Sequence, residues 1–155
     1  MLLLKFNQKE KLMNDIKSLL PHREPFLFVD RLEKYDEEEI IGYKRFGANE
    51  FFFPGHFPEY PVVPGVILVE TMAQCGGAGI AAAGILKDAL FLLATVEKAK
   101  FRNQVRPDDE VRIVVKNLKI GKIAIKQSGK MYLGDKLAAE AEWLCIISPK
   151  KSLKS

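Results

Sequence analysis

Two side chains in this sequence have the chemistry of a base and an acid, His56 and Glu70. His56 is one of only two histidines, and it lies in a loop, residues 54–65, that four prolines stiffen. Glu70 is the only charged residue in the apolar stretch 66–86 that follows. A carboxyl group among apolar neighbours keeps its proton more readily than in water, and a neutral imidazole can accept one. The pair therefore provides a general acid and a general base, with no nucleophile, metal or cofactor.

Each of these two residues also has an ordinary structural explanation. A histidine in a loop is usually a solvated polar residue, and a glutamate in the first turns of a helix stabilises the helix dipole. Gln74 lies one helical turn after Glu70 and could satisfy its carboxylate with a hydrogen bond. The residue types alone therefore leave the catalytic and the structural interpretations open.

The other motifs give no support to a cofactor, a metal site or a covalent mechanism. Cys75 and Cys145 are far apart and lack neighbours of the ligand type, so we expect neither zinc nor a disulfide. The Gly-Ala-Gly at residues 77–79 lies inside a predicted helix instead of after a strand, which argues against dinucleotide binding. We interpret His22 as a structural residue and Cys75 as a packing residue, because nothing nearby would activate the thiol.

A buried helix and a sheet are the elements that must position the acid and the base. Residues 66–84 are apolar on nearly all sides, which predicts a helix that is buried all round, with glycines that allow close packing. Strands are predicted at 26–29, 39–46, 89–96, 98–105, 110–120, 122–132 and 136–147. Long strands with short turns predict an antiparallel meander, and with one buried helix they predict an α+β layout.

Length and composition indicate one domain in a reducing compartment. The chain has 155 residues, of which 48% are hydrophobic and 28% charged, as expected for one globular domain over residues 1–155. We expect a short N-terminal helix at 7–20, capped by Asn7, and a frayed basic tail at 150–155. With no secretory signal or membrane-spanning pattern, and only two cysteines, the cytoplasm is favoured. The net charge of +4 permits an acidic partner, but no pattern indicates nucleic acid or membrane insertion.

Three longer motifs make the sequence similar to a known family. They are LPHREPFLFVDR at 20–31, NEFFFPGHFP at 49–58 and PVVPGVILVETMAQ at 61–74. In order and spacing they closely resemble the FabZ-type 3-hydroxyacyl-[acyl-carrier-protein] dehydratases. The resemblance implies a hot-dog fold, in which an antiparallel sheet wraps a long central helix, and an enzyme without a cofactor. It also implies homodimers with two shared active sites, commonly assembled into homohexamers as trimers of dimers.

The resemblance also assigns roles to individual residues. The catalytic histidine of the family falls on His56 and its catalytic acid on Glu70, where the sister FabA-type dehydratase-isomerases have an aspartate. The implied reaction converts a (3R)-hydroxyacyl thioester into a trans-2-enoyl thioester in type II fatty-acid biosynthesis. The free N–H groups at the helix start, at Gly65 and Val66, would stabilise the thioester oxygen. The residues expected to line the acyl channel are Phe57, Val62 and Leu93.

A row of cations is the expected docking site for an acidic acyl carrier protein. Lys98, Lys100 and Arg102 share parity, so a straight strand would put all three on one face. Positive charges near the channel mouth would steer an acidic partner toward it. The ordinary explanation is that these residues are the solvated face of a strand.

Two other function classes remain open. A hot-dog thioesterase would hydrolyse the thioester with the carboxylate and water, and a non-catalytic module would only bind acyl chains or a partner. The presence of both His56 and Glu70 argues against a non-catalytic module. The histidine loop argues against a thioesterase.

Overall fold

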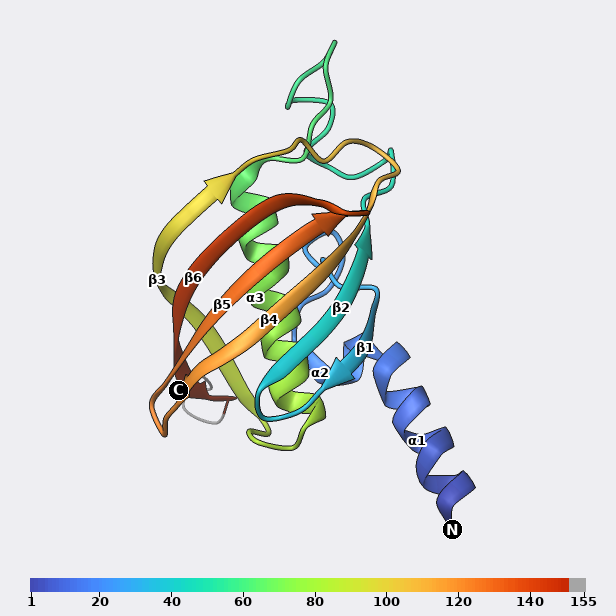
Figure 1. Cartoon of the computed structure of the whole chain (residues 1–155), viewed down its shortest axis with the longest axis vertical. Helices are drawn as coiled ribbons and strands as arrows, with labels where there is room; N and C mark the ends of the chain where they lie inside the picture. Colours follow the sequence, from blue (N-terminus) through green and yellow to red (C-terminus); the bar gives the residue numbers. More distant parts are fainter. Residues whose placement is uncertain (151–155) are drawn as a thin grey trace.

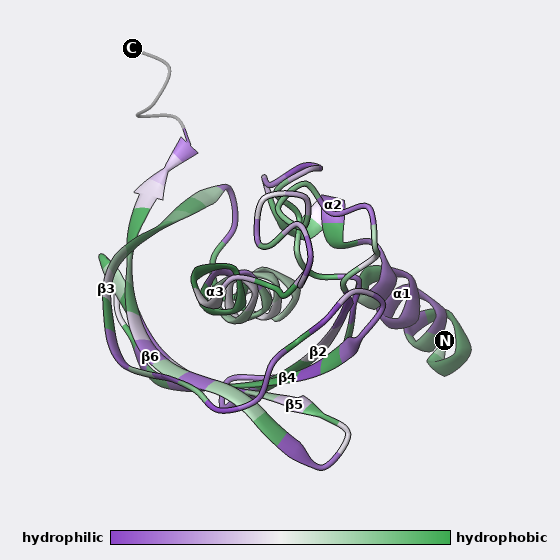
Figure 2. Cartoon of the chain, turned by 90° about the horizontal axis from the view of Figure 1, so that it is seen from above, coloured by the Kyte–Doolittle hydropathy of each residue, from purple (hydrophilic) through white to green (hydrophobic). Residues whose placement is uncertain are grey.

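One long helix lies against a single six-stranded sheet in the computed structural model, which describes residues 1–150 (Figure 1). The helices are α1 (Leu2–Asn14), α2 (Ile16–Leu19) and α3 (Gly65–Ala82). The strands are β1 (Arg31–Tyr35), β2 (Glu39–Arg45), β3 (Ala89–Phe101), β4 (Glu110–Ile120), β5 (Ala124–Leu133) and β6 (Lys136–Pro149). The sheet curves around α3, which Figure 2 shows nearly end-on inside the curve. The predicted α+β arrangement, a long central helix wrapped by an antiparallel sheet, is confirmed.

The helix α3 occupies nearly the range predicted from the sequence. Its mean hydropathy of 1.3 and its length would suit a membrane span, but 67% of it is buried inside the protein, as in a core helix. Its glycines bring neighbours close, since a Cβ on Gly79 would lie 2.3 Å from Cγ1 of Ile40 in β2. A side chain at this position would force Ile40 to shift, so the predicted close packing is confirmed.

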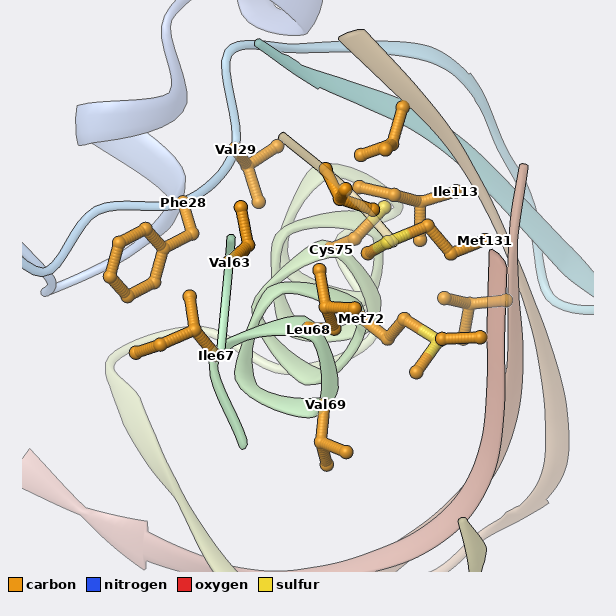
Figure 3. Close-up of a cluster of buried hydrophobic side chains, with 14 of the residues drawn as sticks. Phe28, Val29, Val63, Ile67, Leu68, Val69, Met72, Cys75, Ile113 and Met131 are labelled. Carbon is orange, nitrogen blue, oxygen red and sulfur yellow. The ribbon is translucent and has the colours of Figure 1, made fainter. Parts of the chain in front are cut away.

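Side chains from α3 and from the concave face of the sheet form the core (Figure 3). Leu68, Met72 and Cys75 of α3 belong to one cluster with Ile113 of β4 and Met131 of β5. Cys75 is fully buried, and burial raises the pKa of its thiol to about 12. The thiol therefore stays protonated at neutral pH, and the predicted packing role of Cys75 is confirmed.

The strand order β1-β2-β4-β5-β6-β3 differs from a simple meander. The strands β4, β5 and β6 follow one another as predicted, but β3 pairs with β6 at the edge of the sheet. The two strands predicted at 89–96 and 98–105 are a single strand that ends at Phe101, with a register irregularity between Glu97 and Lys100. The predicted strand at 26–29 is wrong, because that segment runs without a strand partner, and β1 follows it. The sequence does not predict β1, because its five residues are mostly polar and depend on pairing with β2.

The N-terminal helix differs from the predicted range 7–20. It begins at Leu2, so Asn7 lies inside it and not at its start, and it breaks at Asp15 before the single turn of α2. The helix α1 has no buried residue and extends away from the sheet in Figure 1. Of the predicted basic tail, residues 151–155 lie outside the part of the chain that the structure describes.

Candidate active site

Glu70 lies in the second turn of α3 and lines a cavity of about 250 Å³. The cavity is bounded by α3, by β3 and β6, and by the segment before β1. Its apolar lining consists of Leu20, Ala73, Phe91, Leu92, Leu93 and Cys145. Its polar side chains are those of His22, Glu70 and Gln74. With 21% of its side chain exposed, Glu70 is a carboxyl group among mainly apolar neighbours, as predicted.

Gln74 holds the Glu70 carboxyl group in a fixed orientation. Its Nε2 donates to Glu70 Oε1 at 3.0 Å and to the backbone oxygen of Phe26 at 3.1 Å. Its Oε1 accepts the backbone N–H of Phe28 at 2.8 Å. Only an oxygen can accept that N–H, so the amide cannot flip, and its nitrogen must face Glu70. The hydrogen bond from Gln74 to the Glu70 carboxyl group that the sequence suggested is therefore present.

His22 also lies at the acid, a position that sequence reasoning missed. Its Nε2 lies 3.6 Å from Oε1 of Glu70, and its side chain is 28% exposed. Burial lowers the pKa of His22 below its usual 6.5, the Glu70 carboxylate opposes this shift, and Arg23 adds to it. The sequence indicated a structural role for His22 and gave no location for it; the structure places it in the Glu70 cavity.

His56 is held in its loop by one backbone carbonyl. Its Nδ1 lies 2.9 Å from the backbone oxygen of Val62, and its own backbone oxygen accepts the N–H of Val62 at 2.9 Å. The ring stacks on Phe57, with ring centroids 4.2 Å apart. A carbonyl only accepts, so the neutral ring carries its proton on Nδ1, and Nε2 keeps a lone pair. The hydrogen bond thus prepares Nε2 to act as a base.

The predicted acid and the predicted base of one chain do not line the same cavity. Glu70 lines the cavity described above, and His56 is not among the described residues that line it. Three of the predicted substrate contacts, Phe57, Val62 and Val66, are not among the described residues that line the Glu70 cavity, and Val66 at the start of α3 is 76% exposed. A single chain therefore brings only part of the predicted site together.

The Glu70 cavity contains one residue predicted to line the acyl channel, Leu93, and further residues that were not predicted to line it. Phe91 and Gly77 line it, and both also line a smaller space that continues toward Ile80 in the interior. Gly65 begins α3, where a Cβ would lie 3.0 Å from the ring of Phe101. Within residues 1–150, no group of three His, Cys, Asp or Glu side chains is arranged to hold a metal ion.

The three predicted docking cations lie beside carboxylates of β6. Lys98 Nζ is 3.4 Å from Glu142, Arg102 Nε is 3.5 Å from Glu140, and Lys100 pairs in register with Glu140. The strand is not straight here, because the register shifts after Glu97 and Lys98 has a positive φ of 52°. Both carboxylates alternate with buried residues of β6, so these cations lie over the outer face of the sheet.

Comparisons of sequence identify the relatives of the chain. Residues 20–142 match the family of FabA-like domains. A 3-hydroxyacyl-[acyl-carrier-protein] dehydratase FabZ from Desulforamulus reducens is 45% identical over 139 residues, which are 89% of this chain and 98% of that protein. The protein of the same name from Koribacter versatilis is 44% identical over 140 residues, which are 89% of this chain and 90% of that protein.

Solved structures agree with these relatives at the level of the fold. The dehydratase heterocomplex ApeI:P from Xenorhabdus doucetiae matches with a TM-score of 0.77 at 14% identity, over 89% of this chain and 93% of that one. A hypothetical thioesterase from Streptococcus pneumoniae with coenzyme A matches with a TM-score of 0.57 at 9% identity, over 77% of this chain and 85% of that one. The predicted hot-dog fold is thus confirmed, and with the sequence relatives it follows that the chain belongs to the FabZ-type 3-hydroxyacyl-[acyl-carrier-protein] dehydratases.

Proposed function

We propose that this protein dehydrates (3R)-hydroxyacyl chains carried by an acyl carrier protein to trans-2-enoyl chains, in type II fatty-acid biosynthesis in the cytoplasm. Its relatives at 44–45% identity are named for this activity, and the chain covers at least 90% of each. The observation that carries the proposal is Glu70, a carboxyl group held by Gln74 in a mainly apolar cavity. Such a carboxyl group is suited to donate a proton to a leaving hydroxyl.

The proposed mechanism uses one base and one acid. Nε2 of His56 removes a proton from C2 of the thioester, and negative charge develops on the thioester oxygen. The first hydrogen bond of α3 is donated by the N–H of Ile67 to the backbone oxygen of Pro64. The N–H groups of Gly65 and Val66 come before it and have no acceptor within the helix, so they can stabilise this oxygen. Glu70 gives its proton to the hydroxyl on C3, which leaves as water while the double bond forms between C2 and C3.

A homodimer with two shared sites completes this mechanism in our proposal. The separation of His56 from the Glu70 cavity within one chain supports it. The strand β3 also supports the homodimer. It lies at the edge of the sheet and exposes apolar side chains, which a partner subunit would cover. These side chains are Leu92, Leu93, Val96 and Phe101, each 41–52% exposed. We propose that three such dimers assemble into a homohexamer, as the family resemblance implies.

We expect the purified protein to hydrate a crotonyl thioester, because an enzyme that removes water catalyses the reverse reaction with the same groups. Hydration is followed by the loss of the ultraviolet absorbance of the conjugated enoyl thioester. Thiol release is measured in the same samples with a thiol reagent. Loss of absorbance without thiol release is the expected result.

The other outcomes separate the alternative functions. Thiol release would identify a thioesterase, the activity in the name of the hypothetical thioesterase whose solved structure matches this chain. No reaction with crotonyl thioesters on either a small handle or an acyl carrier protein would identify a non-catalytic module. Either result would overturn the proposed dehydratase.

For carrier docking, we expect Lys98→Glu and Arg102→Glu to raise KM for carrier-bound substrate by about two- to fivefold each. The two cations are 70% and 46% exposed but partly balanced by Glu142 and Glu140, so reversal leaves uncompensated negative charge toward an acidic partner. The effect should shrink at high salt, and KM for a short pantetheine substrate should barely change.

A matched control separates the docking surface from net charge. Lys11→Glu makes the same charge change at an exposed side chain of α1, a helix that contacts β1, at the opposite edge of the sheet from β3. KM for carrier-bound substrate should be unchanged in this variant. Equal losses on carrier-bound and pantetheine substrates would assign Lys98 and Arg102 to folding or to the active site, and the docking prediction would be withdrawn.

A further inference from the structure

The second histidine of the chain lies at the acid without a role in the mechanism above. His22 reaches the Glu70 cavity from the segment before β1, with its Nε2 3.6 Å from Glu70 Oε1. Its Nδ1 is buried and has no hydrogen-bond partner among the described residues. A buried polar atom without a partner is rare enough in a folded protein to require an explanation.

The buried Nδ1 indicates which ring nitrogen carries the proton. A proton on Nδ1 would be a buried N–H without an acceptor, whereas Nε2 faces a carboxyl oxygen. The neutral ring therefore places its single proton on Nε2, directed toward Glu70. The charged ring would carry both protons and would leave the one on Nδ1 unsatisfied.

Two N–H groups then converge on one oxygen of Glu70. Gln74 Nε2 donates to Oε1 at 3.0 Å, and His22 Nε2 faces the same atom. When the carboxyl group is protonated, the oxygen that accepts N–H groups is its carbonyl oxygen, so the acid proton belongs on Oε2. The distance of 3.6 Å exceeds a hydrogen bond, and catalytic contacts of this kind tighten when substrate is bound.

We propose that His22 is a positioning residue for the acid: its neutral ring donates Nε2–H to Glu70 Oε1 and, together with Gln74, reserves the acid proton for Oε2. This inference rests on the proposed dehydratase function. The inference requires the His22 ring to be uncharged. A positively charged ring beside Glu70 would stabilise the carboxylate, which has no proton to give.

The other groups around His22 favour the neutral ring. Burial lowers its pKa, and the neighbouring Arg23 lowers it further, while Glu70 alone opposes the shift. Cys145 of β6 lines the same cavity, and burial followed by the Glu70 charge raises the pKa of its thiol to about 11, so the thiol is uncharged at neutral pH. Glu70 is thus the only neighbour whose negative charge would favour a charged His22 ring. When Glu70 holds the proton that it donates in catalysis, it is uncharged and this effect is absent.

Two variants of the full-length protein test the role of the N–H donor. His22→Phe keeps a ring but removes the donor, and it should lower kcat for crotonyl thioester hydration about tenfold with little change in KM. His22→Gln retains an N–H at a similar reach and cannot titrate, so it should restore most of kcat. The kcat–pH profile of this variant should also lose the proton dependence that the His22 ring contributes to the wild-type profile.

Spectroscopy provides a readout that does not depend on activity. The chain has two histidines, so ring-¹⁵N spectra of histidine-labelled wild-type protein contain two sets of signals, and His22→Gln assigns them by removing one. We expect His22 to be neutral and protonated on Nε2 at pH 7. In Glu70→Gln its pKa should fall further, because the Glu70 charge that raises it is gone.

Several outcomes would overturn the proposal. A charged ring, or a neutral ring protonated on Nδ1, at pH 7 would contradict the assigned tautomer even if His22→Phe failed to fold. Wild-type kcat in His22→Phe, or an equal loss in His22→Phe and His22→Gln, would contradict the donor role. If wild-type protein did not hydrate the crotonyl thioester, the proposed function would fail instead, and the tautomer measurement would still stand on its own.

Discussion

His56→Ala and Glu70→Gln should each lower kcat for crotonyl thioester hydration by about 10²- to 10⁴-fold, the usual contribution of a positioned general base or acid. His56→Ala removes the Nε2 lone pair that the hydrogen bond to Val62 prepares. Glu70→Gln removes the acid proton but keeps a side-chain oxygen that can accept from Gln74. Neither change empties the core, so thermal unfolding should remain close to that of the wild type.

The matched control for these losses is Glu59→Gln. Glu59 lies in the same loop as His56, is exposed and makes no part of the Glu70 cavity, so kcat should stay at the wild-type value. Initial rates at saturating substrate give kcat, and circular dichroism reports whether each variant is folded. A folded Glu70→Gln protein that retains most of its kcat would disprove the assignment of Glu70 as the acid.

Activity should return when inactive His56→Ala chains are assembled with inactive Glu70→Gln chains. If each site takes its histidine from one chain and its glutamate from the other, a mixed dimer has one site with both wild-type groups and one site with neither. The rescue should be large, because the starting variants are nearly inactive. Coexpression with two different affinity tags, followed by tandem purification, isolates assemblies that contain both chains, and crosslinking verifies the mixed dimers within them before the hydration assay.

A second pairing controls for stabilisation by mixing alone. His56→Ala chains assembled with chains that carry both His56→Ala and Glu70→Gln contain no intact pair in any site, so they should remain inactive. Verified mixed dimers of the single variants that show no activity would contradict a shared site. They would indicate instead that His56 and Glu70 of one chain meet after a conformational change that the single chain does not display.

The candidate acid and base and the central helix could be read from the sequence because both depend on local information. A charged residue alone in a long apolar stretch is visible without any tertiary contact, and so is a histidine in a proline-rich loop. The helix α3 is encoded by apolar residues on all its faces, and it was found within two residues of the predicted ends. Short turns likewise predict β4, β5 and β6.

The order of the strands could not be predicted in the same way, because pairing joins segments that are distant in the chain. The strand β3 follows α3 in sequence but pairs with β6, the last strand. This pairing makes β3 an edge strand and sets its cations beside Glu140 and Glu142. Periodicity shows which residues share a face of a strand, but it contains no information about the neighbouring strand.

The sequence by itself determined which groups can act as acid and base, since their chemistry belongs to the side chains and their spacing. Only the tertiary structure decided what surrounds the acid. The amide of Gln74 is oriented by a backbone N–H 46 residues earlier, at Phe28, and His22 reaches Glu70 from the same distant segment. Contacts of this kind arise when separate elements pack around one core, so no local pattern in the sequence records them.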